Sequence, residues 1–182
     1  MNAKLRNITA MLIFGTIGLF VKNIELSSSE IALTRGFIGG VTLILATIFL
    51  KKKISFEAIK NNLYLLIFSG LAVGLNWIFL FQGYKYTSIS NATLSYYFAP
   101  VFVTILAPFI LKEKLTLSKF LCVLMALVGM FCIVGVDGIN GGSDLIGIAY
   151  GLLAAGFYAS VILMNKFLKE IDSIEITVIQ LI

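Results

Sequence analysis

The chain has 182 residues, of which 59% are hydrophobic and 13% are charged, and its mean hydropathy is +1.02. This composition excludes a soluble globular domain, because apolar stretches of about 20 residues, long enough to cross a hydrocarbon core, recur between short polar connections. The net charge of +5 does not indicate a nucleic-acid partner, since the basic residues lie in those connections. We therefore predict an all-α polytopic membrane protein that contacts the lipid bilayer, and an internal similarity within the sequence indicates an inverted-repeat helix bundle.

The first apolar stretch covers residues 8–21 and follows two basic residues, Lys4 and Arg6. A stretch of this length also fits the core of a secretory signal peptide. Because no small-residue cleavage site precedes the next long apolar stretch, we interpret it as a first transmembrane helix that enters from the cytoplasm. The next helix is expected to begin at a capping box, in which the side chains of Ser27 and Glu30 each satisfy a backbone N–H group of the other.

This second helix, residues 27–50, carries Arg35 at a depth of about 7 Å. An arginine at depth in a membrane costs on the order of 3 kcal/mol unless it reaches the interface or finds a partner. Two interpretations remain open. Arg35 either faces a cavity, where it meets anionic solute groups or backbone carbonyls, or extends to the outer interface.

A short amphipathic connection follows, and its basic residues indicate a cytoplasmic loop: Lys51, Lys52, Lys53 and Lys60. The third helix covers residues 62–82 and carries polar or amphipathic side chains in an otherwise apolar stretch: Asn76, Trp77 and Gln82. These side chains either line a binding site or form hydrogen bonds to a neighbouring helix.

The fourth helix, residues 88–111, combines polar and aromatic residues with both prolines of the chain. Its first half contains Asn91, Ser95, Tyr96 and Tyr97. Pro100 and Pro108 release the carbonyls of Tyr96 and Thr104 from the helical hydrogen-bond pattern. A broken, tyrosine-lined segment at membrane depth is costly unless it faces a cavity or another helix, so we expect a helix break or gate at the two prolines.

The fifth helix covers residues 117–136 and carries few polar groups. Its cysteines, Cys122 and Cys132, lie about 15 Å apart along a helix and cannot pair with each other, so we interpret them as buried apolar thiols. A sixth helix follows at residues 145–165. A seventh begins at residue 173 and is cut short.

The distribution of basic residues predicts the orientation of the bundle in the cytoplasmic membrane. One side carries Lys4, Arg6, Lys51, Lys52, Lys53, Lys60, Lys112, Lys114, Lys119, Lys166 and Lys169, whereas the other carries Lys22 and Lys85. The N-terminus is therefore predicted to be cytoplasmic.

The sixth helix resembles the first, because residues 158–166 (YASVILMNK) align with residues 14–22 (FGTIGLFVK). With one inserted residue, the alignment continues over two further pairs: Glu30 with Glu175, and Arg35 with Gln180. Five helices separate the two copies, so they insert in opposite orientations. This arrangement is typical of inverted-repeat transporters, whose binding site lies between the repeats.

Three pairs of glycines four residues apart predict close helix packing, either within the bundle or between two copies. They are Gly36 with Gly40, Gly70 with Gly74, and Gly147 with Gly151.

The region from Gly70 to Val136 resembles the EamA family of the drug/metabolite transporter superfamily. The resemblance rests on Tyr84-x-Tyr86-Thr87-Ser88, Ala92, Pro100 and the Glu113-Lys114-Leu115-Thr116 turn. It implies ten helices in two inverted five-helix repeats that move small organic solutes. The first repeat would cover residues 1–136, and residues 144–182 would form an incomplete second repeat. We therefore expect the site to be completed by missing C-terminal helices or by a second copy in a homodimer.

The predicted function is secondary transport of small organic metabolites, amino-acid-like or amphipathic, by alternating access. Tyr and Trp offer apolar faces with one polar group, and Asn and Gln offer both a donor and an acceptor. The candidate cavity residues are Arg35, Asn76, Trp77, Gln82, Asn91, Ser95, Tyr96, Tyr97 and Tyr158. Two further tyrosines, Tyr84 and Tyr86, are expected in the interfacial aromatic belt.

Other classes of protein fit the sequence less well. The chain has no histidine, no carboxylate cluster with ligand spacing and no nucleophile beside a base, so we predict no metal, no cofactor and no enzymatic activity. No carboxylate lies deep in an apolar stretch, so the sequence assigns no proton coupling. A non-transporting accessory subunit or inactive fragment remains the alternative function.

Overall fold

The computed structural model describes residues 3–51, 55–112, 114, 116–136 and 142–181, and these residues form helices without any strand. The helices are α1 (Ala3–Asn23), α2 (Ser28–Phe49), α3 (Phe56–Asn61), α4 (Leu63–Tyr86), α5 (Ile89–Tyr96), α6 (Ala99–Ile110), α7 (Leu117–Val136), α8 (Gly142–Asn165) and α9 (Ser173–Leu181). The predicted all-α architecture is confirmed. Lys52, Lys53, Glu113 and the loop at residues 137–141 lie outside the described residues.

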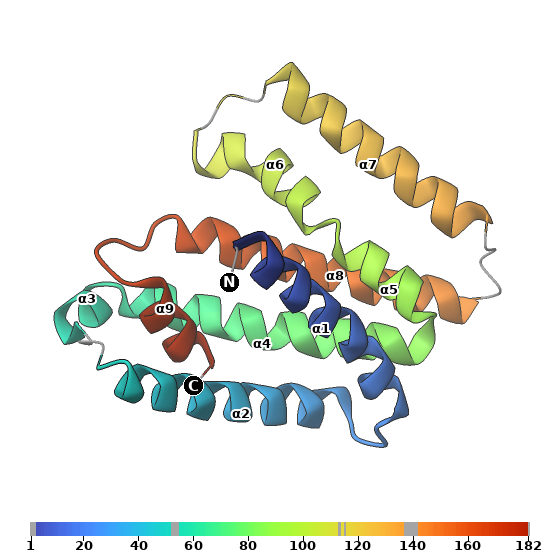
Figure 1. Cartoon of the computed structure of the whole chain (residues 1–182). Helices are drawn as coiled ribbons and strands as arrows, with labels where there is room; N and C mark the ends of the chain where they lie inside the picture. The colour runs from blue at the N-terminus through green and yellow to red at the C-terminus, as the bar shows by residue number, and fades with distance from the viewer. Residues whose placement is uncertain (1–2, 52–54, 113, 115, 137–141, 182) are drawn as a thin grey trace.

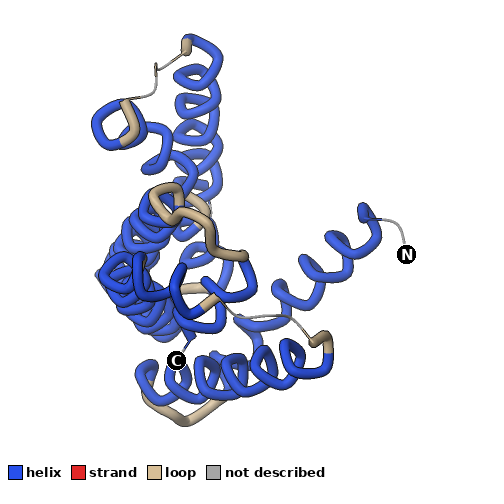
Figure 2. The backbone as a smooth tube through the Cα atoms, turned by 90° about the vertical axis from the view of Figure 1, so that its left-hand side faces the viewer, coloured by secondary structure: helices blue, strands red, loops and turns tan. Residues whose placement is uncertain are grey.

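The centre of the bundle is formed by α4 and α8, which lie side by side in Figure 1. On one side of this pair, α9 lies between α4 and α2, and on the other side α5 and α6 pack on α8. The outermost helix is α7, next to α6, and the N-terminal end of α1 extends away from the other helices in Figure 2. The helix α4 therefore contacts neighbours on several sides and positions most of the candidate site.

Four segments of the described chain are long and apolar enough to cross a membrane: α2, α4, the combined α5–α6 segment at residues 89–110, and α8. The helix α7 is also apolar, and the part of it whose side chains are described without a gap covers residues 117–129. The large hydrophobic side chains on the outer surface fit this setting. Phe37, Phe49 and Phe109, for example, are 73–84% exposed on the protein and would contact lipid.

The capping box at the start of α2 is confirmed. The Ser27 backbone N–H donates to the Glu30 carboxylate at 2.7 Å, and the Glu30 backbone N–H donates to Ser27 Oγ at 3.2 Å. The start of α9 has a similar cap, in which the Asp172 backbone N–H donates to the Glu175 carboxylate at 3.2 Å. These two glutamates are the pair aligned between the proposed repeats.

The predicted fourth helix is two helices, because the chain is interrupted at Tyr97 and Phe98, just before Pro100. Pro100 occupies the first turn of α6, where its missing N–H has no intrahelical partner to lose. The second proline, Pro108, lies inside α6 without ending it. Only the first of the two proposed break positions therefore coincides with a helix end.

Three glycines bring α8 against α4 and α5, and we call Gly83, Gly147 and Gly151 the glycine seam. A Cβ atom on Gly147 would lie 2.5–2.9 Å from Thr87, and one on Gly151 would lie 2.8 Å from the Ala92 carbonyl oxygen. A Cβ atom on Gly83 would lie 3.1 Å from the Gly147 carbonyl oxygen. The seam therefore requires residues without side chains, as the spacing of Gly147 and Gly151 predicts.

The interpretation of the two cysteines as buried thiols is wrong. Cys122 and Cys132 are both exposed and free on α7, which packs mainly against α6 and α5 in the described part of the chain. A long apolar helix at the edge of a bundle faces mainly lipid, so apolar surroundings in a membrane do not require burial in protein. No group of three His, Cys, Asp or Glu side chains suited to a metal ion occurs among the described residues.

Candidate functional site

Arg35 points toward the interior of the bundle, where it packs on aromatic side chains of α4. Its guanidinium carbon lies 4.4 Å from the centroid of the Trp77 ring and 5.9 Å from that of Phe81. A cation over an aromatic face is stabilised by the ring quadrupole, most strongly for tryptophan. Of the two interpretations left open by the sequence, the structure shows the inward-facing one, with the guanidinium over an aromatic ring.

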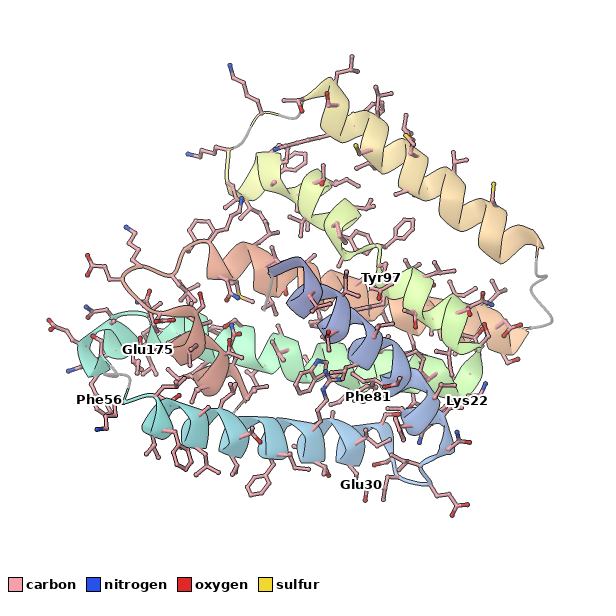
Figure 3. All side chains as sticks on the ribbon, in the orientation of Figure 1. Lys22, Glu30, Phe56, Phe81, Tyr97 and Glu175 are labelled. Carbon is pink, nitrogen blue, oxygen red and sulfur yellow. The ribbon has the colours of Figure 1, made fainter. Side chains whose placement is uncertain are left out.

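Tyrosines from three helices surround this pair. The Tyr84 ring centroid lies 6.4 Å from that of Phe81, and Trp77 and Tyr96 pack against the same buried cluster. The Tyr96 ring centroid lies 5.6 Å from that of Tyr158, which comes from α8. We call this group the Arg35 cluster: Arg35, Trp77, Phe81, Tyr84, Tyr96 and Tyr158. It joins α2, α4, α5 and α8, and Figure 3 shows Phe81 toward the end of α4 that is nearer Lys22 and Glu30.

The placement of Tyr84 in the interfacial belt is wrong, because this side chain is only 5% exposed. Its hydroxyl shares a hydrogen bond of 3.3 Å with Thr93 Oγ1 of α5. Tyr86, one half-turn further, is 39% exposed, and its ring centroid lies 5.6 Å from that of Tyr150. The two tyrosines differ because the helical period directs one toward α5 and the other toward the surface.

Four other candidate residues form hydrogen bonds within or between helices. Asn76 donates to the Ala154 carbonyl of α8 at 2.6 Å, and Gln82 accepts from Ser28 Oγ of α2 at 2.6 Å. Ser95 donates to the Asn91 carbonyl at 2.7 Å, and the Asn91 amide donates to Thr87 Oγ1 at 3.4 Å. The structure thus shows the helix-bonding alternative for Asn76 and Gln82.

Tyr97 lies at the exposed edge of the Arg35 cluster, at the break between α5 and α6 (Figure 3). Its side chain is 62% exposed, and its ring centroid is 6.1 Å from that of Tyr96. The sequence grouped the two tyrosines because they are adjacent, but consecutive residues of a helix point in directions about 100° apart. Of the nine candidate side chains, the structure brings four together: Arg35, Trp77, Tyr96 and Tyr158.

A cavity of about 480 Å³ lies beside the Arg35 cluster, between α2, α4 and α9. Its wall includes Ala32, Gly36, Gly70, Gly74, Trp77 and Gln180. Trp77 belongs to both the cavity and the cluster, so the two features adjoin. The other wall residues are aliphatic, and this lining suits the apolar part of a small molecule.

The two ends of α4 are held by polar contacts to different partners. At the end near Glu30 in Figure 3, Lys85 Nζ donates to the Leu26 carbonyl at 2.5 Å, next to the Ser28–Gln82 bond. At the opposite end, near Glu175, the Asn62 side chain donates to the Lys169 carbonyl at 3.0 Å and accepts from the Lys169 N–H at 3.3 Å. These contacts fix the cavity walls at both ends of the bundle.

Several residues of the site were not among the sequence candidates. They are Phe81, Tyr84, Ser69, Asn165 and Gln180, and Gln180 donates to both Ser69 Oγ and Asn165 Oδ1 at 2.8 Å. For Gln180 a signal existed, because the repeat alignment places it opposite Arg35. Phe81 carries no polar group, and its role depends on which face of α4 meets α2.

Residues 5–135 match the EamA-like transporter family. The uncharacterized transporter YxxF of Bacillus subtilis is 28% identical over 180 residues, which cover 98% of this chain and 58% of that protein. The uncharacterized transporter YoaV of the same species is 31% identical over 107 residues, covering 58% of this chain and 36% of that protein. An uncharacterized transporter of Clostridium kluyveri is 32% identical over 112 residues, covering 59% of this chain and 36% of that protein.

No solved structure matches the chain. The chain spans 58% of the length of YxxF. The family match extends over most of the helices described above and accords with their apolar outer surfaces. It points to a membrane transporter and not to an enzyme. The chain belongs to the EamA-like transporter family.

Proposed function

We propose that the chain acts in secondary transport of small organic metabolites, amino-acid-like or amphipathic, across the cytoplasmic membrane by alternating access. The observation that carries this proposal is the inward-facing Arg35, which packs on Trp77 at 4.4 Å within a cluster supplied by four helices of a transporter family. Aromatic rings and phenol groups bind a solute weakly enough to release it. Such a site requires neither a cofactor nor a bound metal.

The proposed orientation places the N-terminus in the cytoplasm. Lys60 and Lys169 lie at the end of the bundle that carries the Asn62–Lys169 contact, whereas Lys22 lies at the opposite end in Figure 3. An excess of lysine on one side favours that side as the cytoplasmic one. A reporter that is active only in the cytoplasm should therefore give a signal when fused to the N-terminus, and one that is active only outside the membrane should not.

We further propose that residues 1–136 form a first repeat and that residues 144–182 belong to a second. The matching caps support this division, since Glu30 and Glu175 each accept the N–H of the residue that caps their helix. The inverted relationship would give the solute a site between α2, α4 and their counterparts, as expected for alternating access.

Solute counterflow in proteoliposomes tests the proposed transport activity. We would load labelled amino acids and related metabolites and compare Trp77→Leu with Tyr64→Leu, since Tyr64 is an 81% exposed aromatic residue of the same helix. We expect protein-dependent flux that Trp77→Leu lowers at least tenfold and Tyr64→Leu leaves unchanged. Absence of flux at verified insertion, both for this chain and for a version extended to ten helices, would favour a non-transporting subunit.

A further inference from the structure

The cavity between α2, α4 and α9 contains glycines that close packing does not explain. A Cβ atom on Gly74 would meet nothing within 4 Å, and one on Gly36 would meet its nearest neighbour, the Leu181 carbonyl oxygen, at 3.5 Å. Glycine within a helix costs about 1 kcal/mol relative to alanine. In the glycine seam close contacts offset this cost, but at Gly74 the missing side chain only enlarges the cavity.

One wall of the cavity carries a fixed hydrogen-bond acceptor. The Gln180 amide nitrogen donates to Ser69 Oγ and to Asn165 Oδ1, both at 2.8 Å, so both of its N–H groups are used. No hydrogen bond to the side-chain oxygen of Gln180 is formed by the described residues. Among these residues no fully buried side-chain oxygen lacks a partner, so this atom keeps accessible surface. Because an amide oxygen accepts hydrogen bonds, this atom is suited to meet a donor on a bound molecule.

The dimensions of the cavity match a small molecule. The backbone of Gln180 lies 3.3 Å from the position of a Cβ on Gly70, and Trp77 follows Gly70 by seven residues on α4. The acceptor and the indole ring are therefore about 10 Å apart along the helix. A volume of about 480 Å³ lies within the range of small-molecule sites.

We propose that this cavity is a solute pocket for a small organic molecule with a compact apolar body and one N–H or O–H donor. The donor binds the Gln180 side-chain oxygen, and the apolar body lies between Gly74 and Trp77. A lipid acyl chain is a poorer occupant because it offers no donor to that oxygen. This proposal deepens the transport proposal, on which it rests for the identity of the ligand as a transported solute.

Trp77 allows a direct binding test, because it is the single tryptophan of the chain and lines the cavity. Bromine quenches tryptophan fluorescence at contact. We would titrate the purified full chain in nanodiscs with 4-bromophenol, which has an apolar ring and one donor, and with 4-bromoanisole, in which that donor is methylated. A third arm replaces the lipid by phosphatidylcholine with brominated acyl chains.

We expect saturable quenching by 4-bromophenol, with an affinity roughly two- to tenfold higher than that of 4-bromoanisole, as one net hydrogen bond provides. Gly74→Leu should abolish the saturable quenching. Gly156→Leu serves as the matched control, since a Cβ on Gly156 of α8 also meets nothing within 4 Å and Gly156 does not line the cavity. Equal quenching in both variants would overturn the proposal.

Two further comparisons identify the acceptor and the occupant. Gln180→Leu should remove the preference for 4-bromophenol over 4-bromoanisole, whereas Ser69→Ala, which removes one partner of the Gln180 amide nitrogen, should retain it. Strong quenching by brominated acyl chains that Gly74→Leu relieves would show a lipid occupant and overturn the solute assignment. If counterflow is unchanged in Gly74→Leu, the transport proposal holds and this pocket is rejected. If binding is saturable but no counterflow occurs, the pocket is supported and the transport proposal is rejected.

Discussion

The glycine seam and the α2–α4–α9 cavity both contain glycines four residues apart on neighbouring helices, but they differ in what faces those glycines. In the seam, backbone atoms of α4, α5 and α8 approach so closely that a methyl group would collide. In the cavity, Gly74 faces open space. Glycines four residues apart in a membrane helix therefore indicate only that one face of the helix lacks side chains. Whether that face makes close backbone contact or borders a cavity depends on the position of the neighbouring helix.

The largest effect is expected from a substitution that disrupts the glycine seam. Gly151→Leu would place a Cβ 2.7 Å from Ser95 Cβ and 2.8 Å from the Ala92 carbonyl oxygen, and backbone cannot move aside as a flexible side chain can. We expect a loss of about 3 kcal/mol in the free energy of unfolding, together with a smaller yield of monodisperse protein. Fluorescence-detected size exclusion during a heating series measures both quantities.

The control for this prediction is Gly74→Leu, which introduces the same side chain at a similar spacing within another helix. Its stability should stay within about 0.5 kcal/mol of the original chain, as for substitutions without a steric conflict. If Gly151→Leu and Gly74→Leu melt at the same temperature, the distinction between seam and cavity is wrong.

A second change removes the hydrogen bond between α4 and α8 that Asn76 donates. Asn76→Leu removes the bond to the Ala154 carbonyl, which is the main polar contact of this fully buried side chain. We expect a loss of about 1–2 kcal/mol, the upper range for hydrogen bonds between membrane helices. Unfolding in sodium dodecyl sulfate measures it, with Tyr64→Leu as a surface control, and an unchanged midpoint would contradict the structural role of Asn76.

A third change tests the edge of the cavity. Arg35→Met retains a long side chain but removes the cation from the face of Trp77, and we expect a loss of about 1 kcal/mol together with a shift in Trp77 emission. The measurement is the emission maximum of the single tryptophan during thermal unfolding. Unaltered emission in Arg35→Met would show that the guanidinium does not rest on this ring.

The smallest expected effect has the opposite sign. Gly36→Ala adds a methyl group that meets Leu181 at 3.5 Å and Trp77 at 4.0 Å, both ordinary contacts. The helix gains backbone rigidity, so we expect a stabilisation of about 0.5 kcal/mol. Fluorescence-detected size exclusion during a heating series measures this change. In that measurement Gly83→Ala should destabilise the protein, because its methyl group would lie 3.1 Å from the Gly147 carbonyl oxygen.

The sequence predicts the helices and their ends well, because hydrophobic length and capping residues act locally. The Ser27–Glu30 cap and the break before Pro100 follow from such local rules. For Asn76 and Gln82 the sequence could not decide between lining a binding site and bonding a neighbouring helix. The reason is that their partner atoms belong to Ala154 and Ser28, which are distant in the sequence.

Errors arose where a residue's direction depends on packing. Tyr84 was assigned to the interface from its distance to the helix end, yet its face of α4 meets α5. The cysteines of α7 were expected to be buried because they lie in an apolar stretch, whereas a helix at the edge of a membrane bundle exposes its apolar residues to lipid. The cavity itself has no local signature, because its volume depends on how α2, α4 and α9 are spaced.

The position of α4 in the chain has a consequence for biosynthesis. Its most extensive partner is α8, and the acceptor of the Asn76 side chain is a carbonyl 78 residues further along the chain, which is synthesised later. When α4 enters the bilayer during translation, this amide lacks its final acceptor, and burying an unsatisfied amide in hydrocarbon is unfavourable. We expect α4 to remain beside the insertion machinery, or to keep water at Asn76, until α8 has been synthesised.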